Sequence, residues 1–214
     1  MPSQIEQRCF IGMKEEPFVD FPGGRAAVAP LTHLRSTLLG ASILALKHRG
    51  HYETYLTHLP EARRDEILLA VAGQWLPIEL GELHYNACDA MGLPEDEIIE
   101  IGKSVSNLAN GTTFSITMRL AQQGAVTPWL ALGKGPTAWA RSYRGSGFGV
   151  FKLGPKDARV DVLRSSLAGI GYWRTSCLGI FTVLTESFCT KADVRMVPWR
   201  ASDPYSVSYR LSWV

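Results

Sequence analysis

The chain has 214 residues, of which 46% are hydrophobic and 20% are charged, an ordinary composition for a globular domain with a buried core. Twenty-two basic and twenty acidic side chains leave a formal net charge of +2, which is too small for a basic face that holds a nucleic-acid backbone. No apolar run approaches the roughly 20 residues that span a bilayer, and the polar start MPSQIEQR does not resemble a secretory signal. We therefore expect a cytoplasmic protein with no nucleic-acid partner and no membrane span.

The four cysteines are scattered along the chain, and none belongs to a C-x-x-C pair. Free cysteine behaves as a small buried hydrophobic side chain, and a reducing compartment keeps it unpaired. We interpret all four as free thiols: Cys9, Cys88, Cys177 and Cys189.

The first thirty residues carry too many prolines and glycines for a long helix. Residues 9–13 could form a short strand or an edge contact, but the segment as a whole is predicted to be an irregular arm over 1–30. No internal repeat and no further linker follow it. We therefore expect one domain over 31–214.

Helical patterns dominate from Leu31 onward. Leucine and isoleucine recur at helical spacing up to Leu46, and Gly50 follows a basic last turn, so a first helix is predicted over 31–49. Prolines and acidic residues mark the starts of later helices. These are expected around 52–56 and over 61–73, 77–92, 94–109, 114–123 and 128–143.

After Arg144 the hydrophobic period changes to two, which is typical of strands. A hairpin is predicted from 148–152 and 158–163, with a polar turn over 154–157. A strongly apolar helix follows over 172–188 and must be buried on much of its circumference.

A second hairpin is predicted from 192–199 and 205–214. In its last strand Tyr209, Leu211 and Trp213 share one face, and serines and Arg210 share the other. Because strands joined in hairpins pair antiparallel, the predicted fold class is α+β. A multi-helix N-terminal half precedes a hairpin, a helix and a hairpin that form a four-stranded antiparallel sheet.

None of the candidate phosphate-binding and catalytic motifs matches its full pattern. Gly102-Lys103-Ser104 is not a Walker loop, because Glu97 stands where the first glycine is needed. The glycine-rich run 145–149 precedes a strand, whereas a dinucleotide-binding loop follows one. The sequence has no G-x-S-x-G nucleophile elbow either. It therefore assigns no catalytic residue.

All five histidines lie before residue 85. His48 and His51 have metal-ligand spacing, but Gly50 ends a helix between them, so we interpret them as part of a solvated helix end and predict no metal site. His84 lies on the apolar face of its helix near Cys88. Its residue type and position fit either a hydrogen-bonded core histidine or a ligand contact.

Aromatic side chains concentrate between residues 129 and 173, interleaved with arginines. Such a mixture suits ordinary packing, an enclosed small-molecule pocket and a partner surface, and these three readings stay open. If a pocket exists, its predicted lining is Trp129, Trp139, Arg141, Tyr143, Phe148, Tyr172, Trp173 and His84.

Several segments resemble an uncharacterised family of about 200-residue proteins that is expanded in myxobacteria. They are residues 83–102, Pro128-Trp129, 139–143, 154–158, Gly179 and 209–213. The hairpin, helix, hairpin ending is also similar to haem nitric-oxide-binding domains, 4-vinyl-reductase-like domains and Bet3-type vesicle-tethering proteins. That resemblance implies a ligand-binding scaffold with an interior cavity and frequent dimerisation.

The sequence departs from the haem binders of this group. Their Tyr-x-Ser-x-Arg signature precedes the last long helix, where this chain keeps a serine within 161–169 but neither the tyrosine nor the required arginine. Their proximal histidine follows the helix that matches residues 95–107, and this chain has no histidine after His84. The cofactor is thus left unknown, with haem considered unlikely.

The leading functional prediction is a non-enzymatic sensor or regulatory domain in signalling, which binds a hydrophobic small molecule between helices and sheet and can form a homodimer. The alternatives are a protein-interaction or dimerisation module, and an enzyme that acts on an aromatic or polyketide-like substrate. In the enzyme reading, His84 or Tyr143 would be the acid or base.

Overall fold

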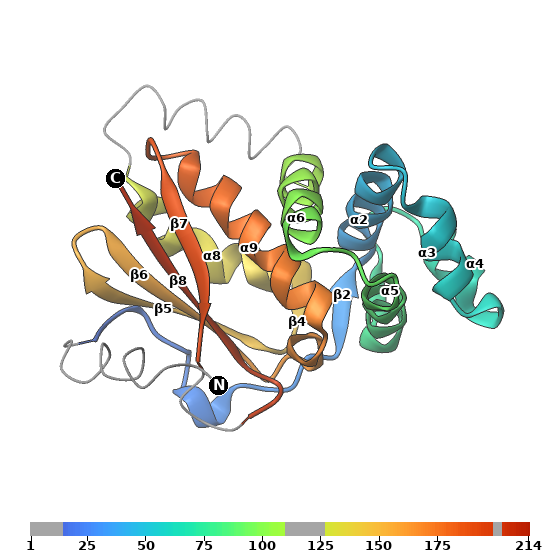
Figure 1. The fold of residues 1–214 in the computed structure, drawn as a ribbon. Helices are drawn as coiled ribbons and strands as arrows, with labels where there is room; N and C mark the ends of the chain where they lie inside the picture. The colour runs from blue at the N-terminus through green and yellow to red at the C-terminus, as the bar shows by residue number, and fades with distance from the viewer. Residues whose placement is uncertain (1–14, 110–126, 199–202) are drawn as a thin grey trace.

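The computed structural model describes residues 15–109, 127–198 and 203–214. Figure 1 shows a helical region built from the first half of the chain, beside a β-sheet on which the long helix α9 (Gly171–Glu186) packs. The predicted α+β class, with helices before a hairpin, a helix and a hairpin, is confirmed.

Most helices lie where the sequence pattern predicts them. They are α2 (Ser36–His48), α3 (Tyr52–His58), α4 (Glu61–Leu68), α5 (Ile78–Ala90), α6 (Glu95–Ala109) and α8 (Pro128–Ser142). Helix α5 follows Pro77, and α6 has three acidic residues in its first turn, as expected at helix N-termini. The helix predicted over 114–123 and the strand suggested over 9–13 lie outside the described residues.

The first helix begins five residues later than predicted. Residues His33–Arg35 form strand β2, which pairs antiparallel with β3 (Trp75–Pro77) and β4 (Tyr143–Arg144) in a small three-stranded sheet. Helical spacing of the leucines continues through this stretch, but tertiary pairing with two distant strands determines its conformation.

Helix α4 is also shorter than predicted. It ends at Leu68, five residues before the predicted end at residue 73, and Leu69 and Val71 are 75% and 72% exposed. The backbone after α4 instead bonds to the start of α2, because the Val71 carbonyl accepts a 2.7 Å hydrogen bond from the Ser36 hydroxyl. The apolar stripe of α4 thus reaches the core mainly through Ile67.

The main sheet has five strands in the order β1-β5-β6-β8-β7, and every pair is antiparallel. Both predicted hairpins are present, as β5 (Gly147–Gly154) with β6 (Asp157–Leu163) and β7 (Ala192–Val197) with β8 (Val207–Trp213). The predicted count of four is corrected by β1 (Glu16–Val19), which the N-terminal arm adds to the edge of β5. The arm is therefore not irregular over its whole length.

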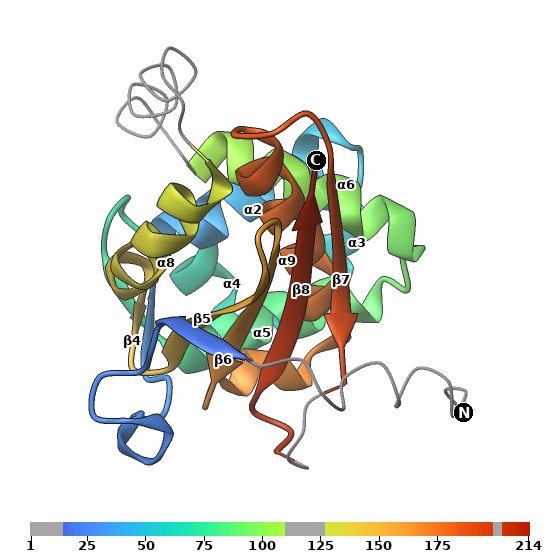
Figure 2. The same cartoon turned by 90° about the vertical axis from the view of Figure 1, so that its left-hand side faces the viewer.

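Helices cover one face of the main sheet, and the arm lies at one end of the other face (Figure 2). Val160 and Tyr209 face the large hydrophobic core on the helix side. On the opposite side, Phe21 and Val28 of the arm pack with Phe151 and Leu163 in a second, smaller core.

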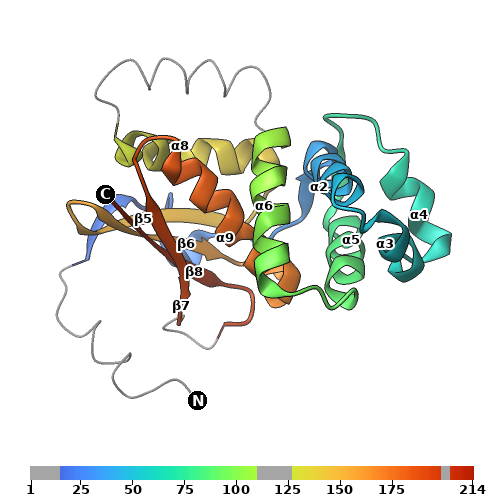
Figure 3. The same ribbon diagram turned by 45° about the horizontal axis from the view of Figure 1, so that its top comes forward.

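Helix α6 lies between α9 and the α2–α5 helices, so it joins the sheet region to the helical region (Figure 3). The contact between α6 and α9 is backbone against backbone at two glycines. A Cβ at Gly102 would lie 2.0 Å from the Ser176 carbonyl oxygen, and one at Gly179 would lie 2.0 Å from that of Ile99. Glycine is required here because any side chain would separate the helices.

None of the described helices combines the length and the hydropathy that crossing a bilayer requires.

Candidate functional site

Four of the predicted site residues meet between the helices and the main sheet, and we refer to Trp139, Tyr143, Phe148 and Trp173 as the interior aromatic cluster. Trp139 is at its centre: its ring centroid lies 4.3 Å from that of Tyr143, 5.4 Å from that of Phe148 and 6.3 Å from that of Trp173. The four side chains come from α8, β4, β5 and α9.

Local sequence explains this convergence. Trp139 and Tyr143 are four residues apart where α8 runs into β4, so they share one side of the chain. Gly135, one turn earlier, leaves room for the Phe148 ring, since a Cβ there would lie 2.5 Å from a carbon of that ring. The cluster therefore depends on a glycine as well as on its aromatic members.

The Trp139 side chain is half-buried, yet its indole nitrogen is shielded from solvent and has no hydrogen-bond partner among the described residues. Most buried indole N–H groups are hydrogen-bonded. An unpartnered donor inside an aromatic cluster is the kind of group that a ligand acceptor satisfies.

Behind this cluster, a chain of buried polar side chains links α2, α3 and α5. The Tyr55 hydroxyl and His84 Nδ1 are 2.8 Å apart, and His84 Nε2 and the Ser42 hydroxyl are 2.9 Å apart. Burial lowers the pKa of His84 to about 3, so the imidazole is neutral at physiological pH. A neutral imidazole has one donor and one acceptor nitrogen, and both are used here.

Two tyrosines connect the polar chain to α9. The ring centroids of His84 and Tyr85 are 4.9 Å apart, and those of Tyr85 and Tyr172 are 6.5 Å apart. Burial raises the pKa of Tyr172 well above its usual value, and the hydroxyl has no partner of good hydrogen-bond geometry in the described part of the chain. His84 and Tyr172 thus lie deeper than the interior aromatic cluster.

The other two predicted site residues lie elsewhere. The indole N–H of Trp129 donates a 2.8 Å hydrogen bond to the Pro155 carbonyl, and the ring packs edge-on against Phe18 and Trp213 near the sheet edge. Arg141 is exposed on α8. Neither residue is part of the interior aromatic cluster.

Sequence reasoning missed the hydrogen-bond partners of His84. Ser42 lies on the apolar face of α2, where a polar residue between buried leucine and isoleucine was a usable signal. Tyr55 could be placed on a helix face, but only the tertiary fold brings α3 against α5.

Of the two histidines with metal-ligand spacing, His51 is part of a surface ion-pair group. The helix ends at His48, and His51 Nε2 lies 2.7 Å from a carboxylate oxygen of Glu97, which also pairs with Arg49. Among the described residues, no three His, Cys, Asp or Glu side chains are grouped so that they could hold a metal ion.

Solved structures of H-NOX domains share this fold at low sequence identity. An Fe(II) unliganded H-NOX protein from K. algicida matches with a TM-score of 0.60 and 11% identity, over 85% of this chain and 97% of that chain. An oxygen-binding H-NOX domain related to soluble guanylate cyclases, in its oxygen complex, matches with a TM-score of 0.55 and 12% identity, over 84% of this chain and 95% of that chain. A structure that probes heme distortion in the H-NOX family has a TM-score of 0.59, 12% identity and the same two coverages.

No protein-family model matches the sequence, and a search of curated proteins finds no match. The predicted likeness in fold to haem nitric-oxide-binding domains is confirmed. The resemblance to a myxobacterial family and to the other two groups stays a prediction. The view that haem is unlikely was wrong, because the fold neighbours are H-NOX domains, one of them determined as an Fe(II) protein.

A haem iron needs a side chain whose lone pair faces the iron. His84 uses one ring nitrogen toward Tyr55 and the other toward Ser42. The thiol of Cys88 and the phenol of Tyr172 are held protonated, because burial raises both pKa values. In this arrangement His84, Cys88 and Tyr172 are each engaged or protonated, so haem binding through one of these three would require that side chain to change partners or lose its proton.

Proposed function

We propose that this chain is a sensor or regulatory domain that binds a small, largely apolar molecule between its helices and the main sheet. The observation that carries the proposal is the interior aromatic cluster, in which the Trp139 N–H is buried without a partner. Domains with the same fold include an oxygen-binding one related to soluble guanylate cyclases, which supports a sensing role.

The side chains define the ligand's chemistry. Aromatic rings supply apolar contact area, and the Trp139 N–H is a donor without a partner among the described residues. A ligand that fits is therefore flat and mostly apolar, with an acceptor oxygen or nitrogen for that N–H. His84, neutral and hydrogen-bonded on both sides, forms the deep end of this site.

Haem is one candidate ligand, since the fold neighbours are H-NOX domains. Titration of the purified full chain with haemin, followed by absorption spectroscopy, tests it. A sharpened Soret band that saturates at one equivalent would identify haem as the ligand. A spectrum that stays that of free haemin would leave the smaller apolar molecules.

Two indoles of the chain form a matched pair for testing the site. Trp139→Phe keeps an aromatic ring but removes the unpartnered N–H, whereas Trp129→Phe removes an N–H that already bonds to Pro155. Ligands found by thermal shift in an apolar library are then titrated calorimetrically. We expect Trp139→Phe to weaken binding about fivefold or more, and Trp129→Phe to leave it unchanged. Equal affinity in both variants would contradict the proposed site.

We also propose, from the sequence, that the chain forms a homodimer and is cytoplasmic. In the described part of the chain, β7 pairs with β8 on one side only, so its outer edge is available for another strand. Light scattering on the purified chain separates a monomer of 23.6 kDa from a dimer of twice that mass.

A further inference from the structure

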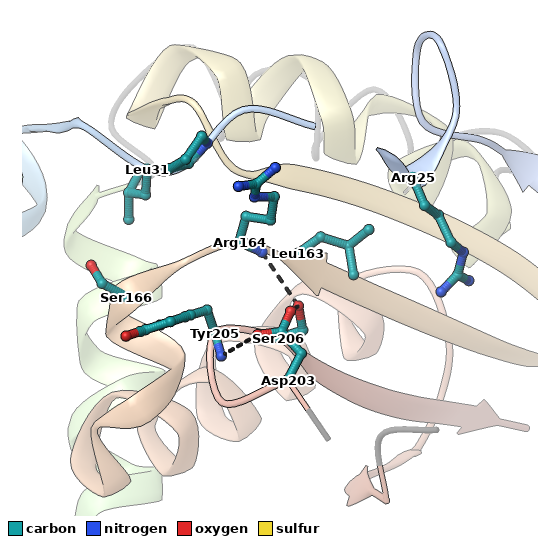
Figure 4. A pocket seen from close by; sticks show the side chains of 9 residues that line it. Arg25, Leu31, Leu163, Arg164, Ser166, Asp203, Tyr205 and Ser206 are labelled. Carbon is teal, nitrogen blue, oxygen red and sulfur yellow. Dashed lines mark hydrogen bonds between the residues drawn. The ribbon is translucent and has the colours of Figure 1, made fainter. Parts of the chain in front are cut away.

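A pocket outside the interior aromatic cluster lies where the N-terminal arm meets the ends of β6 and β8 (Figure 4). Its volume is about 720 Å³, which is in the range of sites for small organic molecules. The arm contributes Arg25 and Pro30, and Leu31 directly follows it. The end of β6 contributes Leu163 and Arg164, and the segment before β8 contributes Tyr205. Three distant parts of the sequence therefore form one pocket.

The apolar part of the pocket suits the body of an organic ligand. Leu31 and Leu163 are 6% and 4% exposed, so they belong to its floor. Tyr205 is 55% exposed, an unusual position for a large aromatic ring without a partner chain. Its ring is available to cover a flat ligand.

The polar part of the pocket favours an anion. Arg164 is exposed, and among the described residues its guanidinium donates one hydrogen bond, of 3.1 Å to the Val28 carbonyl, which uses one of its five N–H donors. No described carboxylate lies within ion-pair distance of it. Arg25 also lines the pocket, although it pairs with Asp161 at 2.8 Å.

The one carboxylate in the pocket wall is already engaged. Asp203 accepts a 2.9 Å bond from the Tyr205 backbone N–H and a 2.6 Å bond from the Ser206 hydroxyl. It therefore fixes the turn before β8 and competes little for Arg164. With two arginines and one such acid, the lining has a net positive charge.

The backbone of Arg164 is held in an unfavourable conformation. Its φ of 54° lies in the left-handed region, which side chains other than glycine and asparagine rarely adopt. The Arg164 N–H donates to the Ser206 hydroxyl at 3.3 Å, and its carbonyl accepts a 2.9 Å bond from Leu31. Such strain, maintained by neighbours on both sides, is frequent at binding sites.

The hydroxyl of Ser166, two residues after Arg164 in the sequence, also lacks a hydrogen-bond partner among the described residues. Ser166 lines the pocket, and its oxygen has no hydrogen-bond partner in the described residues. Buried hydroxyls are usually satisfied, so a ligand oxygen is a fitting acceptor here.

We propose that this pocket is a second ligand site, which takes a small organic anion with an apolar body, such as an aromatic carboxylate. The carboxylate binds Arg164 and Ser166, and the body packs on Leu31, Leu163 and Tyr205. Because Arg25 and Pro30 of the arm also line the pocket and Leu31 directly follows them, the bound anion holds the end of the arm against the sheet.

The test uses 8-anilinonaphthalene-1-sulfonate, an aromatic anion, as the probe on the full chain, followed by fluorescence and calorimetry. Binding is expected to saturate at one equivalent, to be competed by benzoate, and to be at least tenfold weaker for the uncharged N-phenyl-1-naphthylamine. Equal binding of the charged and uncharged probes would overturn the proposal.

Variants locate the probe. Arg164→Asn removes the charge while suiting the left-handed backbone, and it is expected to weaken probe binding about tenfold or more. Tyr205→Ala, an exposed position, is expected to weaken it severalfold. Arg141→Gln removes an exposed arginine outside the pocket and is the matched control, with no change expected.

Trp139→Phe separates this site from the interior one. Probe binding that survives Trp139→Phe but is lost in Arg164→Asn supports the pocket, whatever the fate of the proposed sensor site. Binding that is lost in Trp139→Phe and kept in Arg164→Asn would overturn the pocket and leave the interior site standing.

Discussion

His84 is a strongly perturbed titratable group of the candidate interior site. It is fully buried, and burial lowers its pKa to about 3 from the usual 6.5. Hydrogen bonds to Tyr55 and Ser42 orient a neutral ring. Protonation would place an unpaired charge in the core, so the histidine links stability to pH.

The pH dependence of folding tests this assignment. Below pH 6.5 the unfolded chain binds a proton at His84, whereas the folded chain does not until about pH 3. Stability therefore falls as the pH drops through this window, by about 2 kcal/mol between pH 7 and pH 5 from this group alone. Urea unfolding of the wild type and of His84→Gln at both pH values measures the difference.

Glu97 acts in a separate window, so it does not obscure that comparison. Hydrogen bonding from Arg49 is the main reason that the pKa of Glu97 falls to about 2. Its contribution is present above the unfolded pKa of about 4.3 and is lost as the pH falls toward 2. If the wild type and His84→Gln lose equal stability between pH 7 and pH 5, the assignment of His84 as a neutral buried imidazole is contradicted.

At the scale of elements, the contact between α6 and α9 leaves no room for side chains at two glycines. Cβ atoms at Gly102 and Gly179 would lie 2.0 Å from carbonyl oxygens of the facing helix. We predict that Gly102→Ala or Gly179→Ala destabilises the fold by about 3 kcal/mol or more, because backbone atoms cannot move aside as side chains do.

Gly40 in α2 is the matched control for these variants. It is also helical, but a Cβ there meets no atom within 4 Å. Gly40→Ala should be neutral or stabilising by up to about 1 kcal/mol, since alanine favours helix. The denaturant midpoints of the three variants measure the difference in stability. Similar midpoints for all three would contradict backbone contact between α6 and α9.

The outer face of the main sheet holds a buried ion pair. Arg159 and Asp161 are 5% and 0% exposed, and the Arg159 Nε lies 2.9 Å from Asp161 Oδ1. Asp161 also accepts hydrogen bonds from Arg25 and Ser208. The arm is therefore bound to the sheet through charge as well as through Phe21.

Removal of the acid should expose this dependence. Asp161→Ala leaves Arg159 buried with only Glu15 as a described acidic partner and removes the acceptor of Arg25 and Ser208, so we expect a loss of about 3 kcal/mol in the free energy of unfolding. Glu100→Ala, in an exposed pair with Lys103, should stay within about 0.5 kcal/mol. Thermal and urea unfolding measure both, and a near-neutral Asp161→Ala would contradict the role of the pair.

Sequence patterns predicted the elements whose burial is periodic and local. The alternation in β8 and the apolar run of α9 are both confirmed. The strands β2 and β3 were missed because three residues carry no period, and their pairing joins segments about forty residues apart. Strand β1 was missed for a related reason, since its partner β5 lies far along the chain.

At the scale of the whole molecule, part of the candidate site was predictable. Trp139, Tyr143, Phe148 and Trp173 were grouped by their proximity in sequence, and the fold does bring their rings together. The same reasoning wrongly grouped Trp129 with them. Trp129 is at the start of α8, and its ring packs near the sheet edge. The partners of His84 and the pocket beneath the arm depend on tertiary contacts that no local pattern records.

Binding of a small molecule between the helices and the main sheet is tested by native mass spectrometry of the purified full chain, before and after addition of haemin and of a library of flat apolar compounds. We expect a one-to-one adduct on the 23.6 kDa chain that Trp129→Phe retains and Trp139→Phe weakens. A chain that stays at its bare mass with every compound, or adducts that are indifferent to Trp139, would contradict it.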